Sequence, residues 1–249
     1  MAGLLLARFD PKAPLDGAAW TSRVTALHER VDRTADGDDA RRILGTMLTA
    51  VEKTLRCNAH LPRRYGLALR LDPTLVKRSD TPETPFGLYF VHGLGFDGFH
   101  LRFRDIARGG VRVVLPTGLA QLAAERDRLY AEVYELANAQ QLKNKDIPEG
   151  GAKAVIVAAP EITAERAFKG FIDGILDLMI PSAALAPVDR LGRRETLYLG
   201  PDENITPALI VWCVARAARR GHPLAGSFMS SKPGAGISHK ECRGSPPRA

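Results

Sequence analysis

A lysine behind a glycine pair is the first residue of this chain whose setting suggests chemistry. Lys153 follows Gly150, Gly151 and Ala152, and the apolar run 154–159 comes directly after it. Such a run is typical of a strand that is covered on both faces. Because burial disfavours a charged amine, a lysine at the edge of this strand is expected to donate and accept protons near neutral pH. A solvated lysine in a helix-to-strand loop is the alternative, and for this motif alone it is the better interpretation.

A second block, Ala107–Arg112, places two arginines around a glycine pair. The planar guanidinium groups of Arg108 and Arg112 can each hold a carboxylate through two hydrogen bonds. Gly109 and Gly110 lack side chains and therefore allow a backbone to approach a ligand closely. For this block alone, surface arginines that flank a turn are the better interpretation, and an anion-binding site is the alternative that the other two blocks favour.

A third block, Leu199–Asn204, contains an acid that can move protons. Asp202 follows the turn residues Gly200 and Pro201, which are expected to hold its carboxylate at the end of a strand. An aspartate that serves only the turn is the alternative. Further lysines, Lys143 and Lys145, fall at the predicted C-terminus of a long helix, where the helix dipole alone would favour cations.

Together and in this order, the three blocks resemble the active-site blocks of the glutamate dehydrogenase superfamily. Residues 103–110 and 140–153 are most similar to its large, NAD-specific class, and the resemblance runs from about Asn58 to Gly236. The resemblance implies oxidative deamination of L-glutamate to 2-oxoglutarate and ammonia, with NAD as the hydride acceptor. It also implies assembly into a homo-oligomer.

The resemblance implies roles for single residues. Lys153 matches the reactive lysine, which polarises the attacking water and the carbinolamine oxygen. Asp202 matches the aspartate that shuttles a proton to and from the amino group. Lys143 resembles the lysine that binds the substrate α-carboxylate. Lys145 is its close competitor, and the spacing found in small hexameric members falls on Gln141.

The same resemblance implies two cationic anchors, one at each end of a dicarboxylate: Lys143 is the first and Arg108 is the second. Arg108 stands where small members of the family carry a lysine that binds the side-chain carboxylate of glutamate, and Arg112 can share this contact. A ligand with only one carboxylate would leave a buried charge unpaired, at a penalty of roughly 2–5 kcal/mol. Valine and leucine are therefore expected to be poor substrates.

The overall composition predicts a cytoplasmic protein with an anionic ligand. The chain has 249 residues and a net charge of +7, and its apolar runs are too short to span a membrane. Three distant cysteines, Cys57, Cys213 and Cys242, show neither a disulfide framework nor metal-ligand spacing. Nucleic acid is disfavoured because the basic residues are scattered and only 6% of residues are aromatic. A dicarboxylate accounts for the charge with fewer assumptions.

The elements around these blocks predict an α/β fold with a mixed, mostly parallel sheet and flanking helices, preceded by an N-terminal helical pair. Hydrophobic spacing predicts this pair over 16–32 and 38–57. Later helices are predicted after Gly118, after a cap at Thr163, and from a cap at Thr206 to Gly221. Strands are predicted over 65–71, 86–91, 99–104, 113–115, 154–159 and 195–199.

One glycine-rich run, Gly93–Gly98, spells the dinucleotide-binding fingerprint. That motif needs a helix after its glycines, whereas an alternating strand follows here, so the run is predicted to be a hairpin turn.

We therefore divide the chain into an N-terminal helical region (1–62), a substrate-binding and dimerisation domain (63–236) and a divergent, disordered tail (237–249). No NAD-binding Rossmann domain is expected in it, so the chain is predicted to be the substrate domain of a dehydrogenase. A non-catalytic remnant that binds a dicarboxylate or assembles with full-length subunits is the alternative.

Overall fold

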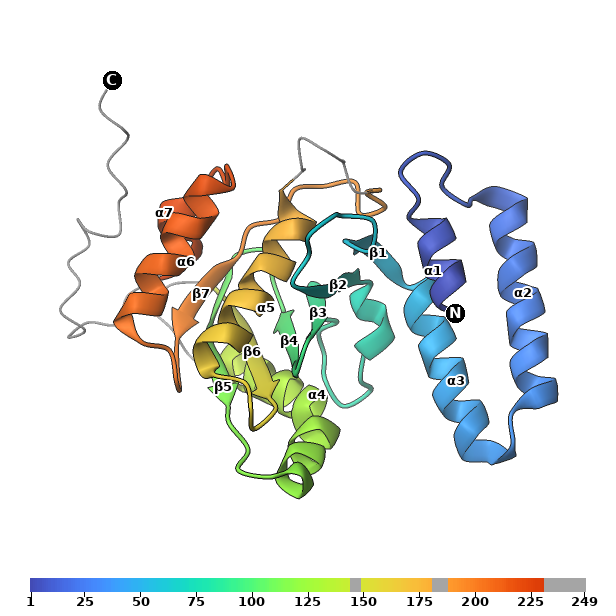
Figure 1. Ribbon diagram of the computed structural model, residues 1–249, viewed down its shortest axis with the longest axis horizontal. Coiled ribbons are helices and arrows are strands. Elements are labelled where there is room, and N and C mark those ends of the chain that lie inside the picture. The colour runs from blue at the N-terminus through green and yellow to red at the C-terminus, as the bar shows by residue number, and fades with distance from the viewer. Residues whose placement is uncertain (144–148, 181–187, 231–249) are drawn as a thin grey trace.

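The computed structural model describes residues 1–143, 149–180 and 188–230. A seven-stranded sheet runs through the molecule (Figure 1). Helix α4, Leu119–Leu142, lies on one face of this sheet, and α5, Ala164–Met179, lies on the other. Helix α6, Pro207–Arg219, packs beside α5. The predicted α/β class with flanking helices is confirmed.

The strands of the sheet lie in the order β1-β2-β3-β4-β6-β5-β7. Their bounds are Thr54–Cys57 for β1, Gly66–Leu71 for β2, Gly87–Gly93 for β3, Phe96–Arg102 for β4, Ala107–Val114 for β5, Gly150–Ala158 for β6 and Tyr198–Pro201 for β7. The second motif block therefore lies inside β5 rather than before a short strand, and the glycine pair before Lys153 begins β6.

The sheet is mixed, as predicted, but it is not mostly parallel. Among the described strands, four neighbouring pairs are antiparallel (β1-β2, β2-β3, β3-β4 and β4-β6). Two pairs, β5-β6 and β5-β7, are parallel. The reason is that β1 to β4 follow one another without an intervening long helix, and parallel neighbours need such a crossover. The parallel part is the part that carries the three motif blocks.

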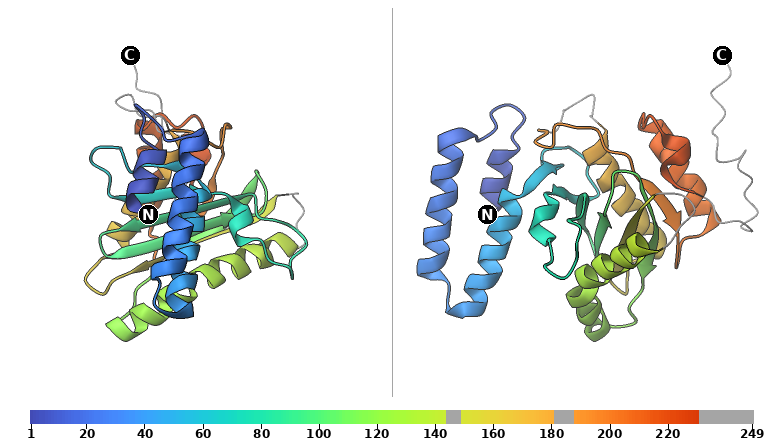
Figure 2. Two further views of the ribbon diagram at one scale, coloured as in Figure 1. Left: turned by 90° about the vertical axis from the view of Figure 1, so that its right-hand side faces the viewer. Right: turned by 180° about the vertical axis from the view of Figure 1, so that it is seen from behind.

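The predicted N-terminal helical pair is present. Helices α2, Gly17–Thr34, and α3, Gly37–Glu52, stand side by side at the β1 end of the sheet, away from β7 (Figure 2). The second helix was expected to reach residue 57, but it ends at Glu52. The last four residues of that range form β1, because pairing with β2 overrides their helical spacing. A further helix, α1, Ala2–Arg8, packs against β1 through Leu5.

The predicted caps fix the starts of the two later helices. The hydroxyl oxygens of Thr163 and Thr206 accept hydrogen bonds from the backbone N–H groups of Arg166 and Leu209. After α6, Gly221 has a φ of +78°, the left-handed value that favours glycine at this position. Two short helices complete the description, the 3₁₀ helix η1 over Pro73–Val76 and α7 over Ala225–Phe228.

The glycine-rich run that spells a dinucleotide fingerprint is a β-hairpin. β3 ends at Gly93, β4 begins at Phe96, and Gly95 at the turn has a φ of +76°. The prediction of a hairpin turn is confirmed, and this run offers no helix N-terminus to a pyrophosphate. Over the described ranges, every helix is too short or too polar to cross a bilayer. The divergent tail 237–249 and Lys145 lie outside the described residues.

Candidate active site

Strand order brings the three motif blocks together. β5 lies between β6 and β7, so the glycine pair of β5 separates Lys153 from the strand that leads to Asp202. Val111, which follows Gly110, pairs with Ala154, which follows Lys153. On the other side, Gly110 pairs with Gly200. Parallel neighbours point to the same face, so the three strands present these positions on one face of the sheet.

Lys153 and Asp202 form an ion pair. The ammonium Nζ of Lys153 donates a hydrogen bond to Oδ2 of Asp202. The side chain of Lys153 is 11% exposed and that of Asp202 is 37% exposed, so the pair is largely enclosed on the lysine side and open on the acid side. Water or a substrate can therefore reach the carboxylate, and a proton can pass between the two groups.

The glycine pair of β5 makes this contact possible. A Cβ at Gly110 would lie 3.0 Å from both Cβ and Oδ2 of Asp202, so Asp202 lies directly over the missing side chain. A Cβ at Gly109 would lie 1.6 Å from the carbonyl oxygen of Ala152, so the backbones of β5 and β6 meet there without room for any side chain. Gly110 therefore leaves room for the side chain of Asp202, and Gly109 allows the backbones of β5 and β6 to pack closely.

Arg108 and Arg112 lie two residues before and two residues after Gly110 in β5, and therefore on the same face of the sheet as Gly110. The Nε atom of Arg108 is 3.5 Å from Oε1 of Glu149, and the side chain of Arg108 is 57% exposed. Arg112 is less exposed and forms an ion pair with Glu132 of α4. Arg108 thus lies at the open end of the site, whereas Arg112 ties β5 to the covering helix.

The end of α4 is held against the start of β6. Lys143 is the C-cap residue of α4, and it is exposed. Two residues earlier, Oε1 of Gln141 accepts a hydrogen bond of 2.7 Å from the backbone N–H of Gly151. A Cβ at Gly151 would lie 2.1 Å from the backbone N of Gln141, so only glycine allows this approach. Gln141 therefore positions β6. Among the described residues at this end of α4, Lys143 is the cation that can reach a ligand.

Two acids beside the site were not singled out from the sequence. Glu149 and Glu132 face Arg108 and Arg112, and each candidate cation of the sheet thereby has a carboxylate within 4.0 Å. Glu149 directly precedes Gly150 within the motif, and this position was the available signal. Glu132 gave none, because it belongs to a charged stretch of α4 that is typical of a solvated helix face.

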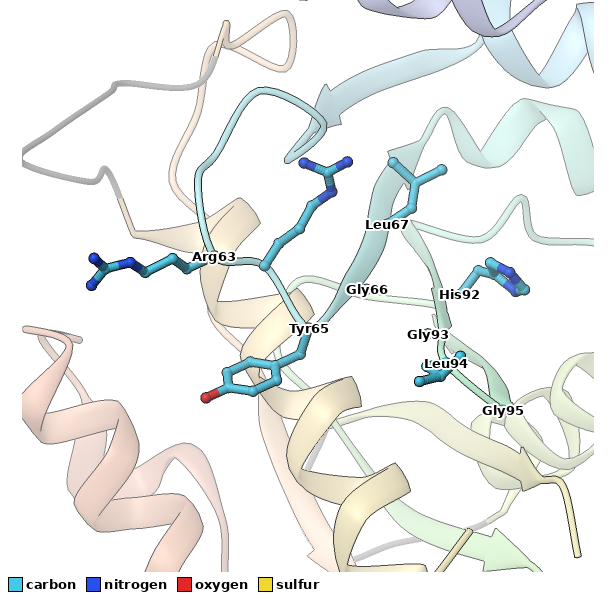
Figure 3. Close-up of a pocket in the computed structure, with 9 residues that line it drawn as sticks. Arg63, Tyr65, Gly66, Leu67, His92, Gly93, Leu94 and Gly95 are labelled. Carbon is cyan, nitrogen blue, oxygen red and sulfur yellow. The ribbon is translucent and has the colours of Figure 1, made fainter. Parts of the chain in front are cut away.

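A surface cavity of about 590 Å³ lies elsewhere, beside the start of β2, the end of β3 and the turn that follows β3. None of the predicted site residues lines this cavity. Its polar side chains do not converge: Arg63 and Tyr65 point away from His92 and Leu94 (Figure 3). Within the described residues, no three His, Cys, Asp or Glu side chains lie close enough together to hold a metal ion.

The chain is similar to proteins of a known family. Residues 26–184 match the family described as bacterial NAD-glutamate dehydrogenase, catalytic domain. The chain belongs to this family.

Relatives of known name extend the match along the chain. Over 207 residues, or 80% of this chain, it is 38% identical to the NAD-specific glutamate dehydrogenase of Saccharomyces cerevisiae. Over 204 residues, or 81% of this chain, it is 37% identical to glutamate dehydrogenase 2 of Dictyostelium discoideum. In both cases the matched part is 19% of the relative, so the chain spans about one fifth of the length of these proteins.

Solved structures show weaker likeness. The hetero-hexameric glutamate dehydrogenase of Thermus thermophilus, in a leucine-bound form, is 19% identical with a TM-score of 0.36, covering 89% of this chain and 43% of that one. The glutamate dehydrogenase of Peptoniphilus asaccharolyticus is 17% identical with a TM-score of 0.34, covering 84% and 43%.

Proposed function

We propose that this chain is the substrate-binding part of an NAD-dependent glutamate dehydrogenase, and that Lys153 and Asp202 are its catalytic pair. The observation that carries the proposal is the ion pair between these two residues from separate motif blocks. Relatives named as NAD-specific glutamate dehydrogenases support the reaction class. The reaction is oxidative deamination of L-glutamate to 2-oxoglutarate and ammonia.

The two groups of the pair have complementary tasks. Lys153, enclosed and fixed on β6, holds the attacking water and the carbinolamine oxygen through its Nζ. Asp202, which is more exposed, takes a proton from the substrate amino group and returns it. Because the two side chains bond directly, a change in the protonation of one is coupled to the other.

The substrate lies across the same face of the sheet. Arg108 binds the side-chain carboxylate, and its 57% exposure at the open end of the site leaves it accessible to a ligand. Lys143 binds the α-carboxylate from the end of α4, and Gly109, Gly110 and Arg112 shape the strand between the anchors. A dicarboxylate satisfies both cations, which favours glutamate over monocarboxylic amino acids.

The described residues do not fit a dinucleotide. The run that spells the fingerprint is a hairpin. In β5-α4-β6, the parallel unit with a covering helix, the turn from the strand into the helix (115–118) contains one glycine, Gly118, and no glycine fingerprint. The chemistry proposed for this part of the chain is therefore to bind the substrate and move its protons. NAD use belongs to the proposal for the complete protein.

Assembly and location are proposed on separate grounds. We propose that the complete protein is a homo-oligomer, as the resemblance of the three motif blocks to the glutamate dehydrogenase superfamily implies. Cys57 and Cys213 are buried free thiols, which suits a reducing, cytoplasmic location.

Binding and turnover test the proposal separately. Calorimetry with 2-oxoglutarate is expected to show binding to the chain, and the Lys153→Ala variant is expected to bind more weakly. Lys169→Ala is the matched control, because Lys169 is an ion-paired lysine on α5 that pairs with Glu165 outside the site. In the complete enzyme, Lys153→Ala should abolish NADH formation from glutamate. Wild-type turnover by that variant would refute the proposed role of Lys153.

A further inference from the structure

The two largest fully buried side chains among the described residues are cations. Arg70 of β2 and Arg102 of β4 are both 0% exposed. They lie on the face of the sheet opposite Lys153: Leu101 pairs with Lys153, and Arg102, the next residue, points the other way. Burying two guanidinium groups is unfavourable unless each is fully engaged, so their contacts indicate what they hold in place.

One carboxylate, that of Glu195, contacts both guanidinium groups. Oε1 of Glu195 accepts hydrogen bonds of 2.7 Å from Nη2 of Arg70 and 2.6 Å from Nη2 of Arg102. The hydroxyl of Tyr89 donates to Oε2 of Glu195 at 2.5 Å. Burial raises the pKa of Glu195, but the hydrogen bonds and charges of the two arginines outweigh burial and lower its pKa to about 2. The carboxylate is therefore ionised wherever the protein is folded near neutral pH.

Arg102 makes three further contacts that Arg70 lacks. Its Nη1 atom donates to the carbonyl oxygen of Asp105 at 2.5 Å, to Oδ1 of the same residue at 3.1 Å and to the carbonyl oxygen of Thr196 at 2.9 Å. Asp105 lies two residues before β5, and Thr196 lies two residues before β7. The guanidinium group of Arg102 thus joins the backbone before β5, which carries Arg108, to the backbone before β7, which leads to Asp202.

β7 is short, so its register depends on contacts at its two ends. It has four residues, lies at the edge of the sheet and pairs with β5, with one bridge from Leu199 to Met229. Past its end, the backbone N–H of Asp202 donates to the carbonyl oxygen of Val111, and Nδ2 of Asn204 donates to that of Val113. Arg102 holds the other end, where the strand begins. A slip of one residue along a strand turns every side chain to the other face. Such a slip would take Asp202 away from Lys153.

We propose that Arg102 is a positioning residue for the catalytic pair: by joining the backbones before β5 and β7, it fixes the register that places Asp202 against Lys153. This inference deepens the proposed function and rests on it only for the roles of those two residues. Arg102 touches neither of them and acts through β7.

The test reads the contact itself through the reactivity of Lys153. Trace labelling with acetic anhydride, followed by peptide mapping, gives the rate at which the Lys153 amine is acetylated in the folded chain. In the wild type, the ion pair with Asp202 engages the amine of Lys153 and slows the reaction. Asp202→Asn should accelerate it several-fold, because the charged partner of the amine is removed.

Arg102→Lys keeps the charge beside Glu195 but lacks the planar fork that reaches two carbonyl oxygens. It should accelerate labelling of Lys153 toward the rate of Asp202→Asn. Arg70→Lys is the matched control: it alters an equally buried arginine on the same carboxylate but leaves the bridge between Asp105 and Thr196, and should label as the wild type does.

A double variant separates positioning from general loosening. If Arg102 acts through Asp202, then Arg102→Lys combined with Asp202→Asn should label no faster than Asp202→Asn alone. A further increase in the double variant, or equal acceleration by Arg70→Lys, would overturn the inference. So would a wild-type rate in Arg102→Lys.

A second perturbation covers the case in which Arg102→Lys does not fold. In Gly87→Ala, the new Cβ would lie 2.8 Å from Nε and 3.2 Å from Cγ of Arg102, so the guanidinium must shift while all charges remain. Labelling should again rise, and only when Asp202 is present. If Asp202→Asn leaves the labelling of Lys153 unchanged, both the proposed catalytic pair and this inference are wrong. If Asp202→Asn accelerates labelling but the Arg102 and Gly87 variants do not, the catalytic pair stands and the positioning role of Arg102 is wrong.

Discussion

Alanine substitutions at Gly109 and Gly110, the two neighbouring glycines of β5, should have different effects on stability and on the contact between Lys153 and Asp202. In Gly109→Ala, the added Cβ would lie 1.6 Å from the carbonyl oxygen of Ala152 and 2.1 Å from its carbonyl carbon. Non-bonded heavy atoms prefer separations of about 3.5 Å, so the two backbones would have to separate by roughly 2 Å. Parallel strands in the centre of a sheet cannot yield that far, and the free energy of unfolding should fall by about 4 kcal/mol or more.

In Gly110→Ala the nearest atoms belong to a side chain. The added Cβ would lie 3.0 Å from Cβ and Oδ2 of Asp202, which is about 0.5 Å too close. Asp202 is 37% exposed and can move outward, so the loss of stability should stay near 1 kcal/mol, at the low end for an overpacked site. The contact to Lys153 should nevertheless be lost, because the acid moves away from β6.

Urea unfolding and acetylation of Lys153 separate the two effects. Gly109→Ala should lower the urea midpoint strongly, and Gly110→Ala should leave it close to wild type while accelerating acetylation of Lys153. Equal stability losses in the two variants would refute the assignment of one glycine to strand packing and the other to the acid. An unchanged acetylation rate in a folded Gly110→Ala variant would refute the placement of Asp202.

Three further outcomes follow from the structure. Folding lowers the pKa of Glu195 from 4.5 to about 2, so its contribution to stability is complete above pH 4.5 and is lost as the pH falls toward 2. This contribution is about 3 kcal/mol. Measurements of the unfolding free energy against pH should show it in the wild type and not in Glu195→Gln. Glu149 competes with a ligand carboxylate for Arg108, so Glu149→Gln should bind 2-oxoglutarate more tightly in calorimetry, by several-fold for a partly exposed pair worth up to about 1 kcal/mol, whereas weaker binding would contradict the competition. Burial raises the pKa of the Cys57 thiol to about 11 and raises that of Cys213 as well, so neither should react with iodoacetamide at pH 8 until the protein unfolds, and rapid labelling of the folded chain would contradict their burial.

Local signals in the sequence predicted the helix starts and the strand that carries Lys153. Thr163 and Thr206 cap their helices because a hydroxyl three residues before a free backbone N–H is a short-range arrangement. The hairpin at Gly93 was equally predictable, since alternation resumes directly after the glycines. In the same way, three ordered blocks indicated that Lys153 and Asp202 share a site, and the structure places them in contact.

Long-range pairing was beyond the same reasoning. Glu195 follows Arg193 and Arg194, and such a run is typical of a solvated surface, yet its side chain is fully buried. Its partners Arg70 and Arg102 are 125 and 93 residues away and alternate with apolar residues as a solvent-facing side would. The antiparallel majority of the sheet was missed for a related reason, because strand direction depends on which strands become neighbours.

A double-mutant cycle on Lys153 and Asp202, read by calorimetric binding of 2-oxoglutarate, tests the central claim most directly. If both side chains act on one ligand as one unit, Lys153→Met and Asp202→Asn should each change the affinity, and the double variant should differ from the sum of the two effects by about 0.5 kcal/mol or more. Effects that add independently, or an affinity that neither substitution changes, would contradict a shared site.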